Sequence, residues 1–150
     1  MLAGPPLKRE GAMEFRDDYD WIDYNPKGFN IHAGPFNIAR LNETEFYMYL
    51  DIEDRHLNQG GVVHGGVTMT LADNAMGMAA YYAGGKPAST IEFGCKLIAA
   101  AKGGLPLYGK AWVERSTKDV CFMSGELWSD GRKTMTASGV WKYIQPKQWG

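Results

Sequence analysis

The chain has 150 residues, of which 45% are hydrophobic and 22% are charged, and its formal net charge is −1 at pH 7. This length and composition are typical of one globular domain with its own hydrophobic core. Lys and Arg are not concentrated in any stretch, which argues against a nucleic-acid partner, because binding to phosphates needs a basic face.

The two cysteines, Cys95 and Cys121, lie in apolar runs and form no CxxC or CxxH pattern. Such thiols are commonly buried and free, so we expect no structural disulfide and a reducing compartment. The N-terminus has no apolar segment of a signal peptide, and no run approaches the ~18 apolar residues of a membrane span. The sequence therefore predicts a cytoplasmic protein without a membrane partner.

Three segments are predicted: an N-terminal extension and cover segment (1–33), one domain (34–145) and a tail (146–150). Within the first, residues 1 to about 13 carry Pro5 and Pro6 and are expected to be loose. The following stretch, FRDDYDWIDY, indicates either a short helix or an irregular cover, with turns at Asn25-Pro26 and Gly34-Pro35.

Strand patterns follow. Phe46, Met48 and Leu50 alternate with Tyr47 and Tyr49, which is the period of a strand. Four more strands are predicted around 91–97, 107–114, 119–129 and 132–144. An Asp-Gly pair at 130–131 predicts a hairpin between the last two, and the short links predict an antiparallel meander.

One segment differs from these strands. After Gly66, residues 67–82 contain no proline and one glycine, Gly77, and Gly84-Gly85 closes the run. Its Ala and Met content predicts a helix of about 17 residues, roughly 25 Å long. Because apolar side chains lie on nearly every face, we expect a buried helix with a sheet curled around it, an α+β fold of five to six strands.

Asp73 is the one ionisable side chain of this predicted helix. A carboxylate in apolar surroundings is costly unless it is paired or hydrogen-bonded. Asp73 is therefore either a structural group, satisfied by Thr70, Asn74 or nearby backbone, or a functional acid.

The helix is preceded by His64-Gly65-Gly66, with Gly60-Gly61 upstream. Open N–H groups at a helix N-terminus can bind an anion or polarise a carbonyl, whereas Gly-Gly alone also suits a tight turn. His64 is a candidate base, ligand or helix-entry residue. Asn58 is a candidate for positioning water or a carbonyl, or a turn former.

Gly65 and Asp73 are eight residues apart, or about 12 Å along one helix. A catalytic acid and an oxyanion donor must both lie within roughly 3 Å of the reacting atoms. If both are catalytic, two antiparallel helices of a homodimer must therefore bring Gly65 of one chain beside Asp73 of the other.

Other chemistries have little support in the sequence. His32, His56 and His64 form no HxH, HxxxH or HExxH spacing, so we expect no metal. The GxSxG, GxxxxGK[ST] and GxGxxG motifs are absent.

The pattern Asn58-x5-His64-Gly65-Gly66-x6-Asp73 resembles the hotdog-fold thioesterases. The similarity is greatest to the phenylacetate-pathway (PaaI-like) branch of the 4-hydroxybenzoyl-CoA thioesterase superfamily, and it covers roughly 34–144. It implies hydrolysis of an acyl-CoA, or of an acyl-carrier-protein thioester, without a cofactor, since coenzyme A is part of the substrate. It also implies a homodimer, commonly paired into a tetramer.

The resemblance further implies a role for each matching residue. Asp73 activates water or attacks the carbonyl, and the Gly65 N–H polarises the thioester oxygen. Asn58 and His64 hold the carbonyl and the water. Thr90, or its neighbour Ser89, assists at the start of the second long strand, and Gly66 and Ser89 contact the substrate.

One stretch departs from the family pattern, since residues 99–104 read Ala-Ala-Ala-Lys-Gly-Gly where members often have a Pro-Ala-Gly-Asp-like turn. This puts part of the substrate entrance in doubt. The competing hypotheses are a non-catalytic acyl-CoA-binding or sensing protein on the same fold, and a homo-oligomer that has lost its ligand.

Overall fold

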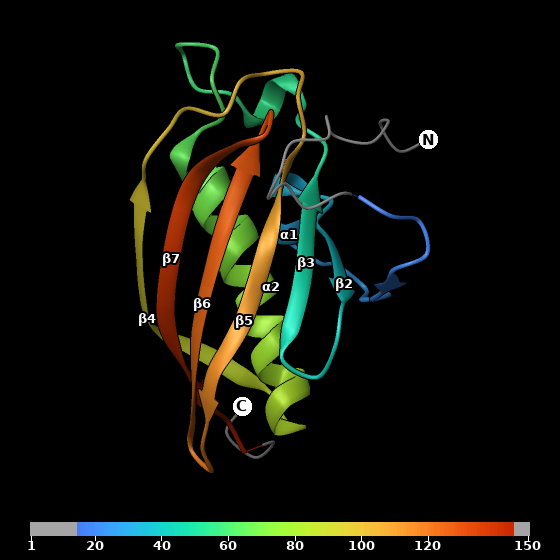
Figure 1. Cartoon of the computed structure of the whole chain (residues 1–150), viewed down its shortest axis with the longest axis vertical. Helices are drawn as coiled ribbons and strands as arrows, with labels where there is room; N and C mark the ends of the chain where they lie inside the picture. The colour runs from blue at the N-terminus through green and yellow to red at the C-terminus, as the bar shows by residue number, and fades with distance from the viewer. Residues whose placement is uncertain (1–14, 146–150) are drawn as a thin grey trace.

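A seven-stranded antiparallel sheet curls around one long helix, α2 (Gly65–Gly84), in the computed structural model, which describes residues 15–145 (Figure 1). The strand order is β1-β2-β3-β5-β6-β7-β4. The strand bounds are β1 Asp20–Trp21, β2 Asn37–Arg40, β3 Glu45–Leu50, β4 Ala88–Leu97, β5 Leu107–Ser116, β6 Val120–Ser129 and β7 Arg132–Tyr143. The predicted α+β arrangement is confirmed, and the short strands β1 and β2 are additions to the five that the patterns indicate.

The core lies between the sheet and α2, which contacts every strand from β3 to β7. Phe46, Met48 and Leu50 of β3 point into it, together with Leu71 and Met76 of α2, and all five are fully buried. Burying one such side chain contributes about 1.5–3 kcal/mol, so this layer fixes α2 against the sheet.

Helix α2 begins and ends with clear caps. The His64 side chain caps the N-terminus, and Gly85, in the left-handed conformation at φ 65°, ends the helix. The prediction of burial on nearly every face is wrong, because the sheet of one chain covers only one side of α2. Met69, Tyr81 and Tyr82 remain 37%, 46% and 38% exposed.

The predicted meander is confirmed, since β5 pairs with β6 and β6 with β7. Asp130 and Gly131 turn the last hairpin with φ angles of 51° and 69°. Two consecutive positive φ angles belong to a type I′ turn, whose twist matches that of paired strands. Strand β4 returns from α2 to the far edge of the sheet, where it pairs with β7.

The N-terminal segment covers the outer face of β3. Its residues form β1 and a helix, α1 (Phe29–Ala33), so the helix lies beyond FRDDYDWIDY rather than within it. The Tyr19 ring packs tilted and the Trp21 ring packs edge-on against Tyr47, which explains why the outward-facing Tyr47 and Tyr49 are as buried as the inward-facing residues of β3.

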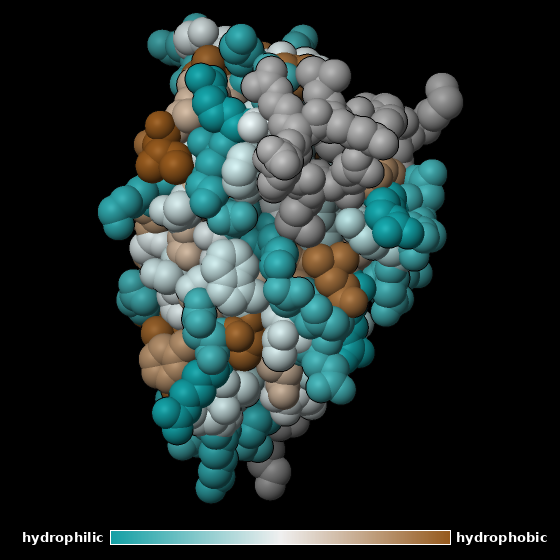
Figure 2. All heavy atoms as spheres, in the orientation of Figure 1, coloured by the Kyte–Doolittle hydropathy of each residue, from teal (hydrophilic) through white to brown (hydrophobic). Residues whose placement is uncertain are grey.

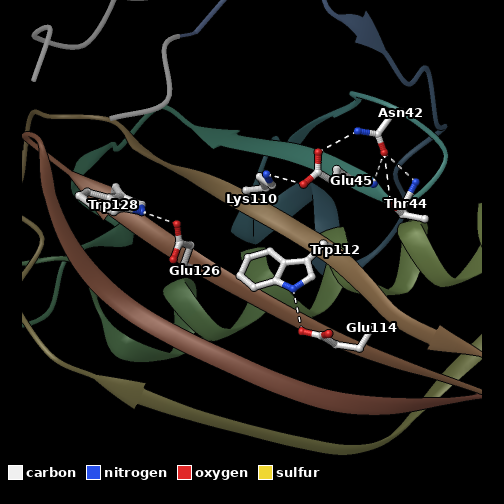
Figure 3. A network of polar contacts seen from close by, with 8 residues as sticks. All are labelled: Asn42, Thr44, Glu45, Lys110, Trp112, Glu114, Glu126 and Trp128. Atoms are coloured by element: carbon white, nitrogen blue, oxygen red, sulfur yellow. Dashed lines mark hydrogen bonds and ion pairs between the residues drawn. The ribbon is translucent and has the colours of Figure 1, made fainter. Parts of the chain in front are cut away.

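Beyond this cover the outer sheet face is polar, with only isolated apolar patches (Figure 2). Lys110 forms an ion pair with Glu45, and the Trp112 indole donates to Glu114 (Figure 3). Both thiols are free, as predicted, with Cys121 buried and Cys95 half-buried. No helix within residues 15–145 is long and apolar enough to cross a membrane.

Candidate active site

Asp73 lies at the middle of α2, half-buried on the side that the sheet leaves uncovered. Its Oδ1 accepts a hydrogen bond of 2.6 Å from the Thr90 hydroxyl on β4. The proposed structural partners are engaged elsewhere, since Thr70 donates to the Gly66 carbonyl and Asn74 donates to the Thr70 carbonyl. The carboxylate is thus oriented by one hydroxyl and still faces open space.

The start of β4 distinguishes Thr90 from Ser89. Thr90 lies opposite Trp141 of β7, and a bulge follows it before Glu92. Ser89, one residue earlier, lies opposite Lys142 and takes part in no hydrogen bond through its side chain within 15–145. Side chains of neighbouring strand residues point to opposite faces, so only Thr90 meets Asp73.

The Thr90→Val variant is expected to lower kcat for thioester hydrolysis by about 10- to 100-fold, because a hydrogen bond to a charged group contributes roughly 1.5–3 kcal/mol. Val keeps the shape of Thr and removes only the donor. Ser89→Ala is the matched control and should retain the wild-type kcat. Steady-state kinetics of both variants decide between the two hydroxyls, and equal losses would contradict the assignment.

A cavity of about 580 Å³ opens beside this pair. Its lining combines polar and apolar side chains from α1, α2, β4 and β7: Asn30, Asp73, Asn74, Gly77, Met78, Tyr81, Pro87, Ala88, Thr90 and Trp141. This mixture is typical of a pocket that holds a small organic group, with few polar groups to orient it.

The N-terminus of α2 leaves one backbone donor unused. The His64 Nδ1 accepts from the Gly66 N–H at 2.8 Å, and the His64 carbonyl accepts from Val67 and Thr68. Among residues 15–145 nothing accepts from the Gly65 N–H. Because Nδ1 is an acceptor, the neutral imidazole of His64 carries its proton on Nε2 and offers a second donor at the helix start.

A second cavity, of about 410 Å³, opens at this helix start, lined by Phe29, His32, Ala33, Arg55, His56, His64, Gly66, Val67 and Thr70. Arg55 holds α1 over it by donating to the carbonyls of His32 and Gly34. The same guanidinium bonds Glu53 and thereby lowers the pKa of that carboxyl.

Asn58 shapes the loop before the helix. Its Oδ1 accepts from the N–H groups of Gly60 and Val62 at 2.8 and 3.3 Å, which is the geometry of a turn former. The side chain is exposed and lies outside the lining of both cavities. Its predicted contact with substrate stays a prediction.

Within one chain the predicted residues that line a cavity therefore divide into two groups. Asp73 and Thr90 line the first cavity, whereas His64 and Gly66 line the second, next to Gly65. Eight residues of α2, about 12 Å of helix, separate Gly65 from Asp73. Each group lacks what the other provides, a carboxylate in one case and a polarising N–H in the other.

The sequence did not reveal Asn30, Arg55 or Trp141 as residues near these cavities. Their positions depend on how α1 and β7 pack on α2, and no local pattern records that packing. Another cavity, of about 630 Å³, lies on the outer sheet face around Trp112 and Ser124, and none of the predicted residues line it. We place the chemistry at α2, because there a carboxylate and an open helix N-terminus occur.

Comparison with known proteins shows the family of the chain. Residues 60–136 match the family model described as "Thioesterase superfamily". A Pseudomonas aeruginosa protein named as an esterase is 31% identical over 109 residues, which cover 71% of this chain and 81% of the relative. Human acyl-coenzyme A thioesterase 13 is 30% identical over 114 residues, or 75% of this chain and 81% of the relative.

A solved structure has the same fold. The PaaI protein from the phenylacetic acid degradation operon of E. coli superposes with a TM-score of 0.70 at 20% identity, covering 75% of this chain and 82% of that one. The family match includes the helix start, Asp73 and Thr90. The chain belongs to the thioesterase superfamily and is a thioester hydrolase.

Proposed function

We propose that this enzyme hydrolyses acyl-CoA thioesters at a site shared by two copies of the chain. Asp73 of one copy provides the carboxylate, and the helix start at Gly65 of the other provides the donor for the carbonyl. The observation that carries the proposal is the 2.6 Å bond between Thr90 and Asp73, which orients a half-buried carboxylate toward a cavity. The name of the human relative, an acyl-coenzyme A thioesterase, supports coenzyme A as the thiol.

The Gly65 N–H stabilises the negative charge that develops on the carbonyl oxygen. It is the first backbone donor of a 20-residue helix, so the helix dipole adds to its hydrogen bond. Gly66 positions His64 through its own N–H, and His64 offers Nε2–H beside the oxyanion. Asn58 holds the loop that leads into this helix start.

Asp73 takes a proton from a water molecule, and the resulting hydroxide attacks the thioester carbon. The tetrahedral intermediate then collapses, the carbon–sulfur bond breaks and the thiolate of coenzyme A leaves. The proton held by Asp73 passes to this thiolate, which restores the carboxylate. A thiolate is a good leaving group at neutral pH, because thiols have pKa values near 8.5, so no strong general acid is required. Direct attack by Asp73 would give an anhydride intermediate and uses the same two half-sites.

Two surfaces of the chain are suited to the required dimer. Strand β4 is an open sheet edge with Ile91 and Leu97 exposed by 59% and 51%, and such edges pair readily with another strand. The uncovered side of α2 lies beside it and carries Met69. Pairing two β4 strands antiparallel would place two α2 helices face to face, with each Asp73 near the partner's Gly65. Dimers then pair into a tetramer.

The competing hypothesis from the sequence was a non-catalytic acyl-CoA-binding protein. Binding alone requires no carboxylate beside the thioester, and a carboxylate held by Thr90 therefore favours hydrolysis.

A panel of aryl- and alkyl-acyl-CoA esters, followed by release of free thiol, tests the proposed function. We expect turnover with at least one class of acyl group and none with Asp73→Ala. Tight binding of every ester without thiol release would favour the binding protein instead.

A further inference from the structure

The Trp141 side chain packs into a space that two glycines leave open. It is only 1% exposed, and it points from β7 toward α2. A Cβ at Gly139 would lie 2.8 Å from the indole Cζ3, and one at Gly77 would lie 3.4 Å from the indole Nε1. The six-membered ring therefore rests on Gly139, and the N–H edge faces the gap that Gly77 leaves in the surface of α2.

The indole N–H of Trp141 has no hydrogen-bond partner within residues 15–145. The unpaired side-chain atoms of that part of the chain that are fully enclosed are Tyr47 Oη, His56 Nε2, Ser129 Oγ and Thr134 Oγ1. The Trp141 Nε1 is not one of them, so it keeps some contact with open space. Gly77 and Trp141 both line the 580 Å³ cavity that contains Asp73 and Thr90. A nearly buried donor thus reaches the candidate active site through the gap at Gly77.

The geometry and charge restrict what this donor binds. Gly77 follows Asp73 by four residues, so the gap that the N–H faces lies about one helical turn from Asp73, roughly 5–6 Å between Cβ positions. A buried donor is costly unless something accepts its hydrogen bond. An anionic acceptor would be repelled by Asp73, and a neutral oxygen would not.

We propose that the Trp141 N–H is a specificity-determining donor for a neutral oxygen of the thioester, one helical turn from the carbon that reacts. This rests on the proposed function and deepens it. The oxygen belongs either to the acyl group, as a hydroxyl or oxo substituent, or to the amide of the pantetheine arm nearest to the sulfur. In the first case, plain hydrocarbon acyl groups leave the donor unpaired, whereas in the second case every acyl-CoA pairs it.

Two variants test the donor independently, one by deleting it and the other by covering it. Trp141→Phe deletes the N–H, and Gly77→Ala places a methyl group in ordinary contact with Nε1 and covers it. Gly77→Ala also raises helix propensity, so loss of folding is not expected there even if Trp141→Phe is unstable. Trp112→Phe is the matched control, because Trp112 faces the opposite side of the sheet and donates to Glu114 (Figure 3).

The readout is a ratio of kcat/KM values within matched pairs of thioesters. One pair is 3-hydroxyhexanoyl-CoA against hexanoyl-CoA, which isolates an acyl oxygen. The other is the N-acetylcysteamine thioester of hexanoic acid against an alkyl thioester of equal length without the amide. We expect about a tenfold preference for the oxygenated member of one pair, falling toward one in Trp141→Phe and Gly77→Ala and persisting in Trp112→Phe.

The pair whose ratio falls identifies the source of the oxygen. Ratios that stay the same in both variants, with all thioesters still hydrolysed, would overturn the proposal. A general steric loss would lower both members of a pair equally and would also count against it. If no thioester is hydrolysed the proposed function fails, and Kd values for the two CoA esters, measured by calorimetry in wild type and Gly77→Ala, then decide the role of Trp141.

Discussion

The Asp73→Asn variant is expected to lower kcat/KM for acyl-CoA hydrolysis by about a thousandfold, within the 10²–10⁴ range of acid–base catalysis. Asn keeps the shape of Asp and the hydrogen bond from Thr90, but it neither accepts a proton from water nor attacks a carbonyl. Because Asp73 is half-buried on the uncovered side of α2, the fold does not depend on its charge.

Free-thiol release with the best ester of the acyl-CoA panel measures this loss. Asp119→Asn, an exposed change in the turn between β5 and β6, is the matched control and should retain full activity. Circular dichroism and size-exclusion chromatography should show unchanged folding and assembly. Full turnover in Asp73→Asn would exclude the mechanism.

The Gly65→Pro variant is expected to lower kcat by about 10²–10³-fold, the usual effect of losing one oxyanion donor. Proline removes the backbone N–H and nothing else that the helix needs, since the first helical position tolerates proline. His64 already has the extended conformation, with ψ 132°, that a residue before proline requires.

Gly65→Ala is the matched control, because it adds a Cβ and keeps the N–H. That Cβ would lie 2.9 Å from Leu97 Cδ1, the far end of an exposed side chain that can move aside. We therefore expect Gly65→Ala to retain most of the activity that Gly65→Pro loses. Equal losses in the two variants would indicate a steric effect and not a lost donor.

Local sequence signals predicted most of the fold. Gly84-Gly85 marked the end of α2, and Asp130-Gly131 marked the last hairpin, because positive φ angles at such positions favour these residues. The structure of the N-terminal cover segment was harder to predict. Its aromatic residues are half-buried by contact with Tyr47 and Tyr49, which lie far along the chain, so neither β1 nor α1 has a strong local pattern.

The candidate site was predicted in part. The sequence placed Asp73 on α2 and His64 at its start, and the structure adds the Thr90 bond and shows that Gly65 keeps the open N–H. The sequence did not indicate that one side of α2 is left uncovered. An apolar helix has the same pattern whether its own chain or a second chain buries it. The position of Trp141 beside the cavity could not be predicted for a related reason. Its indole N–H faces the cavity because Gly77, on a different element, has no side chain.

Activity of a defined heterodimer tests the shared site most directly. A chain with Asp73→Ala and a chain with Gly65→Pro are co-expressed with different affinity tags, and the mixed dimer is purified on both. In a two-fold dimer one site then carries both changes and the other carries neither, so we predict about half of the wild-type activity. A mixed dimer no more active than the two parent homodimers would contradict the shared site.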